Sequence, residues 1–300
     1  MACATSALLN PDTEGYLNLP QQAVYYRHYR CSAFADRRLL LLHGAGVDGQ
    51  LTWEAIVGHL LHWSEILVPD LRGTGKTHFP DRVEHPFETV EVVADLSALL
   101  DSLQWDKFDL AGYSYGGLVA MQLKAARPVA VEKTYLFEPG LLNGGTQEES
   151  HSRREILLEA AQRLRVDEEL EFGLGIFLDA VSPQRSRNSR NEEIVRTRLA
   201  HRPKGLAAIL EAVIRAARQL DRAQLIAAQA HVSSFVGERS SGEIFDFCQA
   251  IARGRTDWTC HLIPGADHAL PFQKPQAIAQ LMNTDLESFR AVQPGLWAAR

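Results

Sequence analysis

One segment, Gly112–Gly117, carries the residue types that a nucleophilic serine requires. Its sequence, GYSYGG, contains the pattern G-x-S-x-G and lies between an apolar run ending at Ala111 and a helical run from Leu118. A sharp strand-to-helix turn at this point would raise the serine side chain above the sheet, and the glycines would leave room for neighbouring elements. The amino end of the following helix would favour negative charge beside it. We therefore predict that Ser114 is a nucleophile.

A serine needs a base to become nucleophilic, and histidine is the most common one. Five histidines follow Ser114 in the chain: His151, His201, His231, His261 and His268. The first two fall in a helical region, the third begins a strand and the fourth lies within a strand. His268 stands in a loop, residues 265–269, just after the last predicted strand. A histidine there could reach the serine from the same edge of a parallel sheet, so we predict that His268 is the base.

A second glycine-rich loop, Gly44 to Gly49, suggests a different chemistry. It matches G-x-G-x-x-G, follows an apolar run and precedes a helical pattern. Asp70 stands about 20 residues further on, where a ribose-binding acid is expected. The loop therefore supports an alternative hypothesis, an NAD(P)-dependent oxidoreductase. The motif is weak alone, because glycines are common in any tight strand–helix turn.

Alternating strand and helix patterns surround these loops. Apolar runs or alternating residues predict strands, and apolar residues at helical spacing predict helices. We expect strands at residues 22–31, 38–43, 65–69, 108–111, 133–137, 232–236 and 258–263. We expect helices at residues 51–63, 89–103, 118–126, 243–252 and 275–292. This order predicts an α/β fold with a mostly parallel sheet flanked by helices.

Residues 141–230 interrupt the alternation with helical patterns only, at 149–165, 168–180, 190–199 and 204–220. We therefore predict a core domain formed by residues 1–140 and 231–300, and an inserted helical cap, or lid, formed by 141–230. The insertion lies between two strands, at the carboxyl edge of the sheet, which suits a lid over a site. We expect its helices to lack a core of their own and to pack on that edge.

Composition excludes several classes of protein. Of 300 residues, 46% are hydrophobic and 23% charged, which is typical of a globular chain and not of a disordered one. The net charge of −6, from 31 basic and 37 acidic residues, offers no basic arm for nucleic acid. No apolar run approaches the roughly 18 residues that a membrane span needs. A small-molecule substrate is the partner we expect, and the oligomeric state stays open.

Cysteine usage and the first residues bear on the compartment. The four cysteines, at 3, 31, 248 and 260, lie far apart and form no C-x-x-C pair, so no zinc site is expected. Residues 1–10 lack the basic start and long apolar run of a signal peptide. These features predict a cytoplasmic protein with reduced thiols.

Four motifs in order resemble the α/β-hydrolase superfamily over nearly the whole chain. His43-Gly44 resembles its oxyanion loop, Asp70–Gly73 its D-x-R-G turn, Gly112–Gly117 its nucleophile turn and Gly265–His268 its late histidine loop. The resemblance implies an α/β-hydrolase fold with a helical cap, and it turns Gly44–Gly49 into an oxyanion turn. A serine at the nucleophile position is unlike the dehalogenases and epoxide hydrolases, which use aspartate.

The resemblance also implies roles for neighbouring residues. The backbone N–H groups of Ala45 and Tyr115 would stabilise an oxyanion, and His43, Gly44 and Tyr113 would contact substrate. Tyr115 and four cap residues are further candidates for the pocket wall: Phe172, Leu174, Phe177 and Leu178. For each of the four cap residues, ordinary packing between the cap and the core is the simpler interpretation. No metal and no cofactor is implied.

The third member of a triad is where the chain departs from the family. The family usually has an aspartate in a G-x-x-D turn, and here that turn ends in Ser240, which cannot balance an imidazolium. Glu138, at the end of a predicted strand, is favoured over Glu238, which stands two positions early in the turn. Asp246 and Asp267 are weaker candidates. A missing acid, with activity low or lost, stays possible.

Together these features predict a cofactor-independent serine hydrolase that cleaves an ester or related acyl bond of a small, largely apolar substrate. Ser114, His268 and Glu138 would form the triad. The resemblance also covers carbon–carbon bond hydrolases, thioesterases and perhydrolases, which the sequence does not separate. A non-catalytic or degenerate ligand-binding protein is the alternative outside catalysis, supported by the serine at position 240.

Overall fold

The computed structural model describes residues 10–31, 37–140, 147–185, 187 and 190–292. Eight strands form one sheet in the order β1-β2-β4-β3-β5-β6-β7-β8. In chain order they are β1 Thr13–Leu19, β2 Gln22–Arg30, β3 Arg38–Leu42, β4 Glu65–Pro69, β5 Phe108–Tyr113, β6 Val131–Phe137, β7 Val232–Gly237 and β8 Trp258–Ile263. β1 and β2 are antiparallel to their neighbours, and the strands from β4 to β8 pair in parallel. The predicted α/β-hydrolase fold with a mostly parallel sheet is confirmed.

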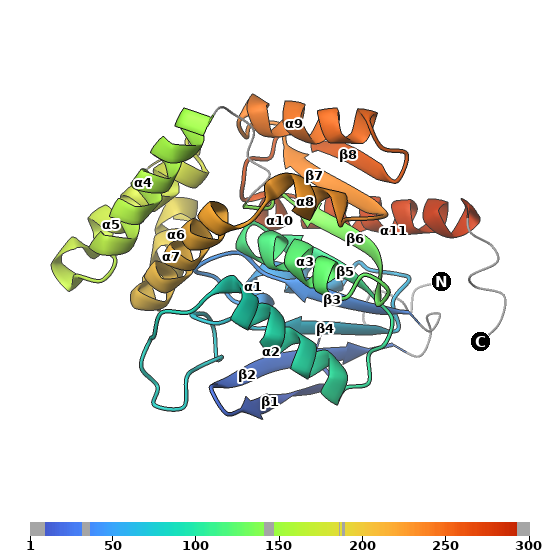
Figure 1. Cartoon of the computed structure of the whole chain (residues 1–300), viewed down its shortest axis with the longest axis horizontal. Coiled ribbons are helices and arrows are strands. Elements are labelled where there is room, and N and C mark those ends of the chain that lie inside the picture. The colour runs from blue at the N-terminus through green and yellow to red at the C-terminus, as the bar shows by residue number, and fades with distance from the viewer. Residues whose placement is uncertain (1–9, 32–36, 141–146, 186, 188–189, 293–300) are drawn as a thin grey trace.

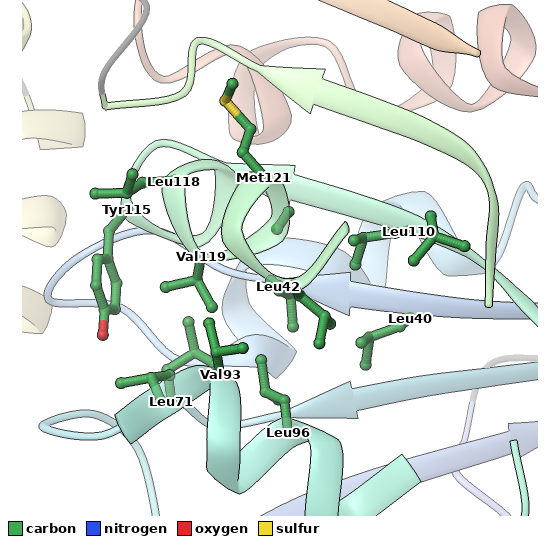
Figure 2. Close-up of a cluster of buried hydrophobic side chains, with 14 of the residues drawn as sticks. Leu40, Leu42, Leu71, Val93, Leu96, Leu110, Tyr115, Leu118, Val119 and Met121 are labelled. Atoms are coloured by element: carbon green, nitrogen blue, oxygen red, sulfur yellow. The ribbon is translucent and has the colours of Figure 1, made fainter. Parts of the chain in front are cut away.

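Alternate side chains of the central strands enter two separate hydrophobic clusters, one on each face of the sheet. Leu40 and Leu42 of β3 belong to the first, and Leu39 and Leu41 to the second. All four are fully buried, which explains why this strand is a continuous apolar run. Figure 2 shows Leu40 and Leu42 pointing toward the same cluster as Leu110 of the neighbouring strand.

Helices cover both faces of the sheet. The first cluster lies under α2 (Thr89–Ser102), α3 (Tyr115–Ala126) and α9 (Gly242–Arg253), and the second under α1 (Gly49–Val57), α10 (Leu270–Gln273) and α11 (Pro275–Val292). Figure 1 shows α2 and α3 in front of the sheet and α1 behind it. Each parallel strand from β3 on therefore ends on one shared edge, between two helical layers.

Five helices and a short 3-10 turn occupy the described residues between β6 and β7: α4 Gln147–Arg163, the 3-10 turn Asp167–Glu169, α5 Leu170–Val181, α6 Arg190–Leu199, α7 Pro203–Gln219 and α8 Arg222–Ala227. Figure 1 shows α4 to α7 together at one end of the sheet. We expected these helices to lack a core, which is wrong. Leu174, Leu206 and Leu210 belong to a third hydrophobic cluster that also contacts Ala45 and Val47 of the core.

One arginine fastens the inserted helices to the core. Arg202, the residue before α7, donates from Nη1 to the carbonyl oxygens of Thr74, Gly75 and Thr77 at 2.6, 3.0 and 2.7 Å. Its Nε also donates to Glu84 at 2.8 Å. Since a charged donor bonding several carbonyls holds both segments in one geometry, α7 is docked firmly on the loop after β4.

The structure differs from the expected elements in four places. β1 was missed because its side chains are exposed or half-buried, so it lacks a strong apolar signal. The first helix ends at Val57 and not near residue 63, since Gly58 caps it. The short helices α8 and α10 were not expected either. Among the described residues, no helix is both long enough and apolar enough to cross a membrane.

Candidate active site

Ser114 stands at the turn between β5 and α3 in a backbone conformation that residues other than glycine rarely adopt. Its φ is 52° and its ψ is −115°, and it is the residue that precedes the first turn of α3. Four backbone hydrogen bonds to described residues hold it: its N–H donates to Phe137 at 2.9 Å, and its carbonyl accepts from Gly117, Leu118 and Gly140 at 3.0, 3.2 and 3.0 Å. Such strain persists only where the surroundings impose it, and it is typical of functional sites.

The glycines of this turn are required because neighbouring backbone atoms approach them too closely for a side chain. A Cβ on Gly112 would lie 2.5 Å from the carbonyl oxygen of Gly116. A Cβ on Gly116 would lie 2.4 and 2.5 Å from the carbonyl oxygens of His43 and Leu42, at the end of β3. Because these neighbours are backbone atoms, they cannot move aside. The G-x-S-x-G pattern therefore lets α3 start directly against the adjacent strand.

A continuous line of hydrogen bonds joins Ser114, His268 and Glu138. Nε2 of His268 lies 3.1 Å from Oγ of Ser114, and Nδ1 lies 2.7 Å from Oε2 of Glu138. A carboxylate accepts only, so Nδ1 carries the proton and Nε2 is left to accept from the serine hydroxyl. The ring of Tyr113 packs against the imidazole, with centroids 5.3 Å apart. The three residues that the sequence singled out as a triad meet at the carboxyl edge of the sheet.

Glu138 is buried and fully engaged. It is 2% exposed, and its Oε1 accepts from the N–H of Gly237 at 2.7 Å and the hydroxyl of Ser240 at 2.6 Å. Burial by itself raises the pKa of Glu138, but the hydrogen bond and charge of His268, with the Ser240 and Gly237 donors, lower it below the ordinary value of 4.5. The side chain is therefore a carboxylate at neutral pH.

The other candidate acids do not touch His268. Glu238 is exposed and accepts from the N–H of Gly265 at 2.8 Å. Asp267 is buried, but its Oδ1 accepts from the N–H of Ala269 and from Gln273. Asp246 lies exposed on α9. Ser240, at the position where the family has its aspartate, contacts the carboxylate that replaces it. The sequence placed Ser240 at this turn but did not indicate that its hydroxyl would hold Glu138.

A cavity of about 710 Å³ opens onto Ser114 and His268. Ala45 and Tyr113 line it from the core, together with Phe272 after β8. The inserted helices supply its apolar wall: Phe177, Leu178, Val181, Ile194, Val195 and Leu199. These helices therefore lie over the edge of the sheet that carries Ser114. The cavity wall also holds Arg198, Arg239 and Lys274, which the sequence analysis did not single out.

Several residues expected at the pocket lie elsewhere. Phe172 is 58% exposed, under the guanidinium of Arg163, and Leu174 packs inside the third cluster. The ring of Tyr115 is buried in the first cluster, and Figure 2 shows it directed away from the strands toward Leu71. Its side chain therefore does not line the cavity, although its backbone N–H stands beside Ser114.

His43 and Gly44 do not line the cavity either, which corrects the expectation that they contact substrate. His43 is fully buried; its Nδ1 lies 2.8 Å from the Gly44 carbonyl, and its Nε2 accepts from the N–H of Leu71 at 2.8 Å. Burial lowers the pKa of His43, which keeps the ring neutral. Gly44 is needed because a Cβ there would lie 2.7 Å from the ring of Tyr113. Both residues shape the loop that presents Ala45.

Two backbone N–H groups near Ser114 lack an acceptor within the part of the chain that the structure describes. Neither the N–H of Ala45 nor that of Tyr115 donates to an acceptor among the residues that the structure describes. The N–H of Tyr115 lies at the amino end of α3, where unpaired N–H groups attract negative charge. These two amides are the ones that the sequence analysis assigned to an oxyanion.

The Gly44–Gly49 loop is poorly suited to a dinucleotide. The buried Asp70 carboxylate is taken up by Arg27, Gly49 and Lys76 at 3.0, 3.0 and 2.9 Å, so it is not available to a ribose. The carboxylate of Asp48 caps α1 by accepting from Leu51, and it would repel a phosphate there. No group of three or more potential metal ligands occurs among the described residues.

Comparison with known proteins agrees with the fold described above. A sequence model of the alpha/beta hydrolase family matches residues 39–281. Lipase LipV of Mycobacterium tuberculosis is 34% identical over 110 residues, covering 37% of this chain and 40% of the lipase. A 2-hydroxy-6-oxo-2,4-heptadienoate hydrolase of Pseudomonas putida is 30% identical over 105 residues, or 34% of this chain and 37% of that one. The chain therefore matches about two fifths or less of the length of these relatives.

Solved structures match over nearly the full length. A putative lipase of Acinetobacter baumannii has a TM-score of 0.75 at 13% identity, with 96% of this chain and 94% of that one covered. A thermophilic esterase of Thermogutta terrifontis has a TM-score of 0.72 at 21% identity, with 92% and 98% covered. At these identities the likeness shows the fold alone. With the family match over residues 39–281, it establishes that this chain belongs to the alpha/beta hydrolase family.

Proposed function

We propose that this protein is a serine hydrolase in which Ser114 attacks a carbonyl carbon, His268 acts as general base and Glu138 orients the imidazole. One observation carries the proposal: the hydrogen bonds from Ser114 through His268 to Glu138, at 3.1 and 2.7 Å, on the wall of a cavity. Geometry of this kind defines a triad, whatever the positions in the sequence. The relatives named lipase, esterase and hydrolase support a hydrolytic reaction.

The reaction follows from where each proton can go. Nε2 of His268 takes the hydroxyl proton as Oγ of Ser114 bonds to the carbonyl carbon, and the imidazolium that forms is stabilised by Glu138. The N–H groups of Ala45 and Tyr115 donate to the resulting oxyanion. The imidazolium then protonates the leaving alcohol, and an acyl group remains on Ser114. Water, activated by the same imidazole, releases the acid.

We further propose that helices α4 to α8 act as a cap. Their residues Phe177, Val181 and Leu199 supply apolar surface to the cavity that holds Ser114. This surface favours an apolar acyl or alcohol group next to the ester. The cap would also limit access of water to the acyl group on Ser114. The division of the chain into core residues 1–140 and 231–300 and a cap of 141–230 belongs to this proposal.

The alternatives are less well supported. A degenerate ligand-binding protein was attractive because Ser240 replaces the usual aspartate, but Glu138 supplies a carboxylate at 2.7 Å from Nδ1 of His268. The oxidoreductase hypothesis needs Asp70 to bind a ribose, but the Asp70 carboxylate is already paired with Arg27. The free thiols of Cys31, Cys248 and Cys260 support the cytoplasmic location that we include in the proposal.

A covalent probe and one substitution test the proposal. The chain should react stoichiometrically with a fluorophosphonate and hydrolyse 4-nitrophenyl hexanoate, and Ser114→Ala should lose both, with kcat lowered at least about 10³-fold. Ser288→Ala, which removes an exposed hydroxyl on α11, is the matched control and should retain both. Labelling that persists in a folded Ser114→Ala protein, or turnover within a few fold of the parent, would rule out Ser114 as nucleophile.

A further inference from the structure

Three basic side chains line the cavity beside the proposed nucleophile, and none of its described lining residues is a carboxylate. They are Arg198 on α6, Arg239 after β7 and Lys274 after α10. The proposed reaction uses none of them. Their presence is notable because the chain as a whole carries a net charge of −6.

The cations stand on two sides of the reacting groups. On the histidine side, Nζ of Lys274 lies 3.5 Å from where a Cβ of Gly265 would be, and the N–H of Arg239 donates to the carbonyl of Ala266 at 2.8 Å. On the opposite side, Arg198 precedes Leu199, whose side chain lies 2.5 Å from where a Cβ of Gly46 would be. Gly46 follows Ala45, one of the two proposed oxyanion donors.

Little within the protein neutralises these charges. None of the ion pairs found among the described residues includes Arg198 or Lys274. Arg239 lies 3.6 Å from Asp267, a loose contact with its side chain 48% exposed. The carboxylate of Glu138 keeps its negative charge, but it is buried, accepts hydrogen bonds from His268 and Ser240, and is not part of the cavity wall. Among the described residues, the cavity wall therefore presents three basic side chains and an apolar surface.

We infer that the substrate carries an anionic group, a carboxylate or a phosphate, in addition to the acyl bond that is cleaved. Arg198, Arg239 and Lys274 would bind this group while the apolar wall holds the chain between it and the ester. Arginine and lysine are the residues that recognise such anions, and a cleft lined by charges of one sign raises the local concentration of the opposite ion. The inference rests on the proposed serine hydrolase and adds the substrate class to it.

Two esters of equal length test the inference. Mono(4-nitrophenyl) adipate and 4-nitrophenyl hexanoate differ by a carboxylate in place of a methyl group at the far end of the chain. We expect kcat/KM to be at least tenfold higher for the adipate ester at low ionic strength, and the preference to shrink as salt is added. A preference that is absent, or that favours hexanoate, would overturn the inference and leave the serine hydrolase standing.

Substitutions identify the groups responsible. Arg198→Gln and Lys274→Gln should each lower the ratio of the two kcat/KM values at least fivefold. Because both esters are measured on the same protein sample, partial misfolding lowers both values and leaves the ratio unchanged. Arg190→Gln is the matched control, since Arg190 lies on the same helix but faces a separate depression with Glu171 and Glu193. A ratio altered equally by Arg190→Gln would contradict a role for the cavity cations.

Binding without turnover separates this inference from the proposed function. Ser114→Ala protein is titrated with hexanoate, hexyl phosphate and hexanamide, which share an apolar chain. We expect at least one anion to bind tenfold more tightly than the amide and to lose this advantage in Ser114→Ala/Lys274→Gln; the tighter anion identifies the group. Equal binding of all three would overturn the inference even if the parent protein hydrolyses esters. Anion binding by a protein that hydrolyses no ester would remove only the proposed reaction.

Discussion

The carboxylate of Glu138 accepts a hydrogen bond from Nδ1 of His268 at 2.7 Å, although the two residues are 130 positions apart in the chain. Glu138 directly follows β6, whereas the acid of the family usually follows β7, the next strand in the sheet. Ser240 stands at that usual position and donates to the other oxygen of the same carboxylate at 2.6 Å. A carboxylate can thus reach the histidine from either position, 138 or 240.

Replacing Glu138 should remove most of the activity. In Glu138→Gln the amide cannot stabilise an imidazolium, and it can hold the wrong histidine tautomer, so we expect kcat for an ester to fall about 10³- to 10⁴-fold. Glu238→Gln is the matched control and should stay within about threefold, since among the described residues the Glu238 carboxylate hydrogen-bonds the N–H of Gly265 and not His268. Equal losses in the two variants would remove Glu138 from the triad.

A carboxylate restored from the neighbouring strand should rescue this variant. Ser240 Oγ already lies within hydrogen-bond distance of Glu138, so an aspartate side chain there reaches toward the same histidine nitrogen. We expect Glu138→Gln/Ser240→Asp to regain at least tenfold in kcat over Glu138→Gln. Steady-state kinetics on one ester settles the comparison. A double variant no faster than the single one would show that position 240 cannot supply the acid.

Acid stability should depend on the hydroxyl of Ser240. The pKa of Glu138 lies below its ordinary value of 4.5, so its ionised form stabilises the folded chain above that pH, and the contribution is lost as the pH falls through the folded-state pKa. Ser240→Ala removes one of the contacts that lower this pKa. We expect the midpoint of acid unfolding, followed by tryptophan fluorescence, to move to higher pH, while kcat/KM at pH 8 falls less than about tenfold. Ser240→Thr keeps the hydroxyl and should leave the midpoint unchanged; an unmoved midpoint in Ser240→Ala would refute the link.

The glycines of the nucleophile turn should tolerate no side chain. In Gly116→Ala the new methyl group would meet the carbonyl oxygens of His43 and Leu42 at 2.4 and 2.5 Å, so we expect the free energy of unfolding to fall by about 3 kcal/mol or more. Gly242→Ala, in the first turn of α9, is the control: nothing lies within 4 Å of its added Cβ. Urea unfolding of both variants measures the difference, and similar stabilities would contradict the steric argument.

The sequence by itself determined the local features of the protein. The leucine run of β3 predicts a strand buried on both faces. The glycines around Ser114 predict a tight turn in which neighbouring backbone segments approach closely. The position of His268 in the loop after the last strand predicts it as the base, because the carboxyl ends of parallel strands share one edge. The α/β-hydrolase fold follows from the same alternation of elements, and it is confirmed. The exposed strand β1 was missed, because polar residues on a sheet edge leave no periodic apolar signal.

Only the tertiary structure decided which groups meet. Glu138 and Glu238 were both open from their positions in the chain, and the order β5-β6-β7 with the positive φ of Glu138 directs only the former at His268. The same holds for the cavity: Arg198 comes from α6 and Lys274 from the residue between α10 and α11, and the two line one cavity only because the inserted helices pack on the core. Contacts between residues a hundred positions apart depend on strand order and packing, which local residue patterns do not encode.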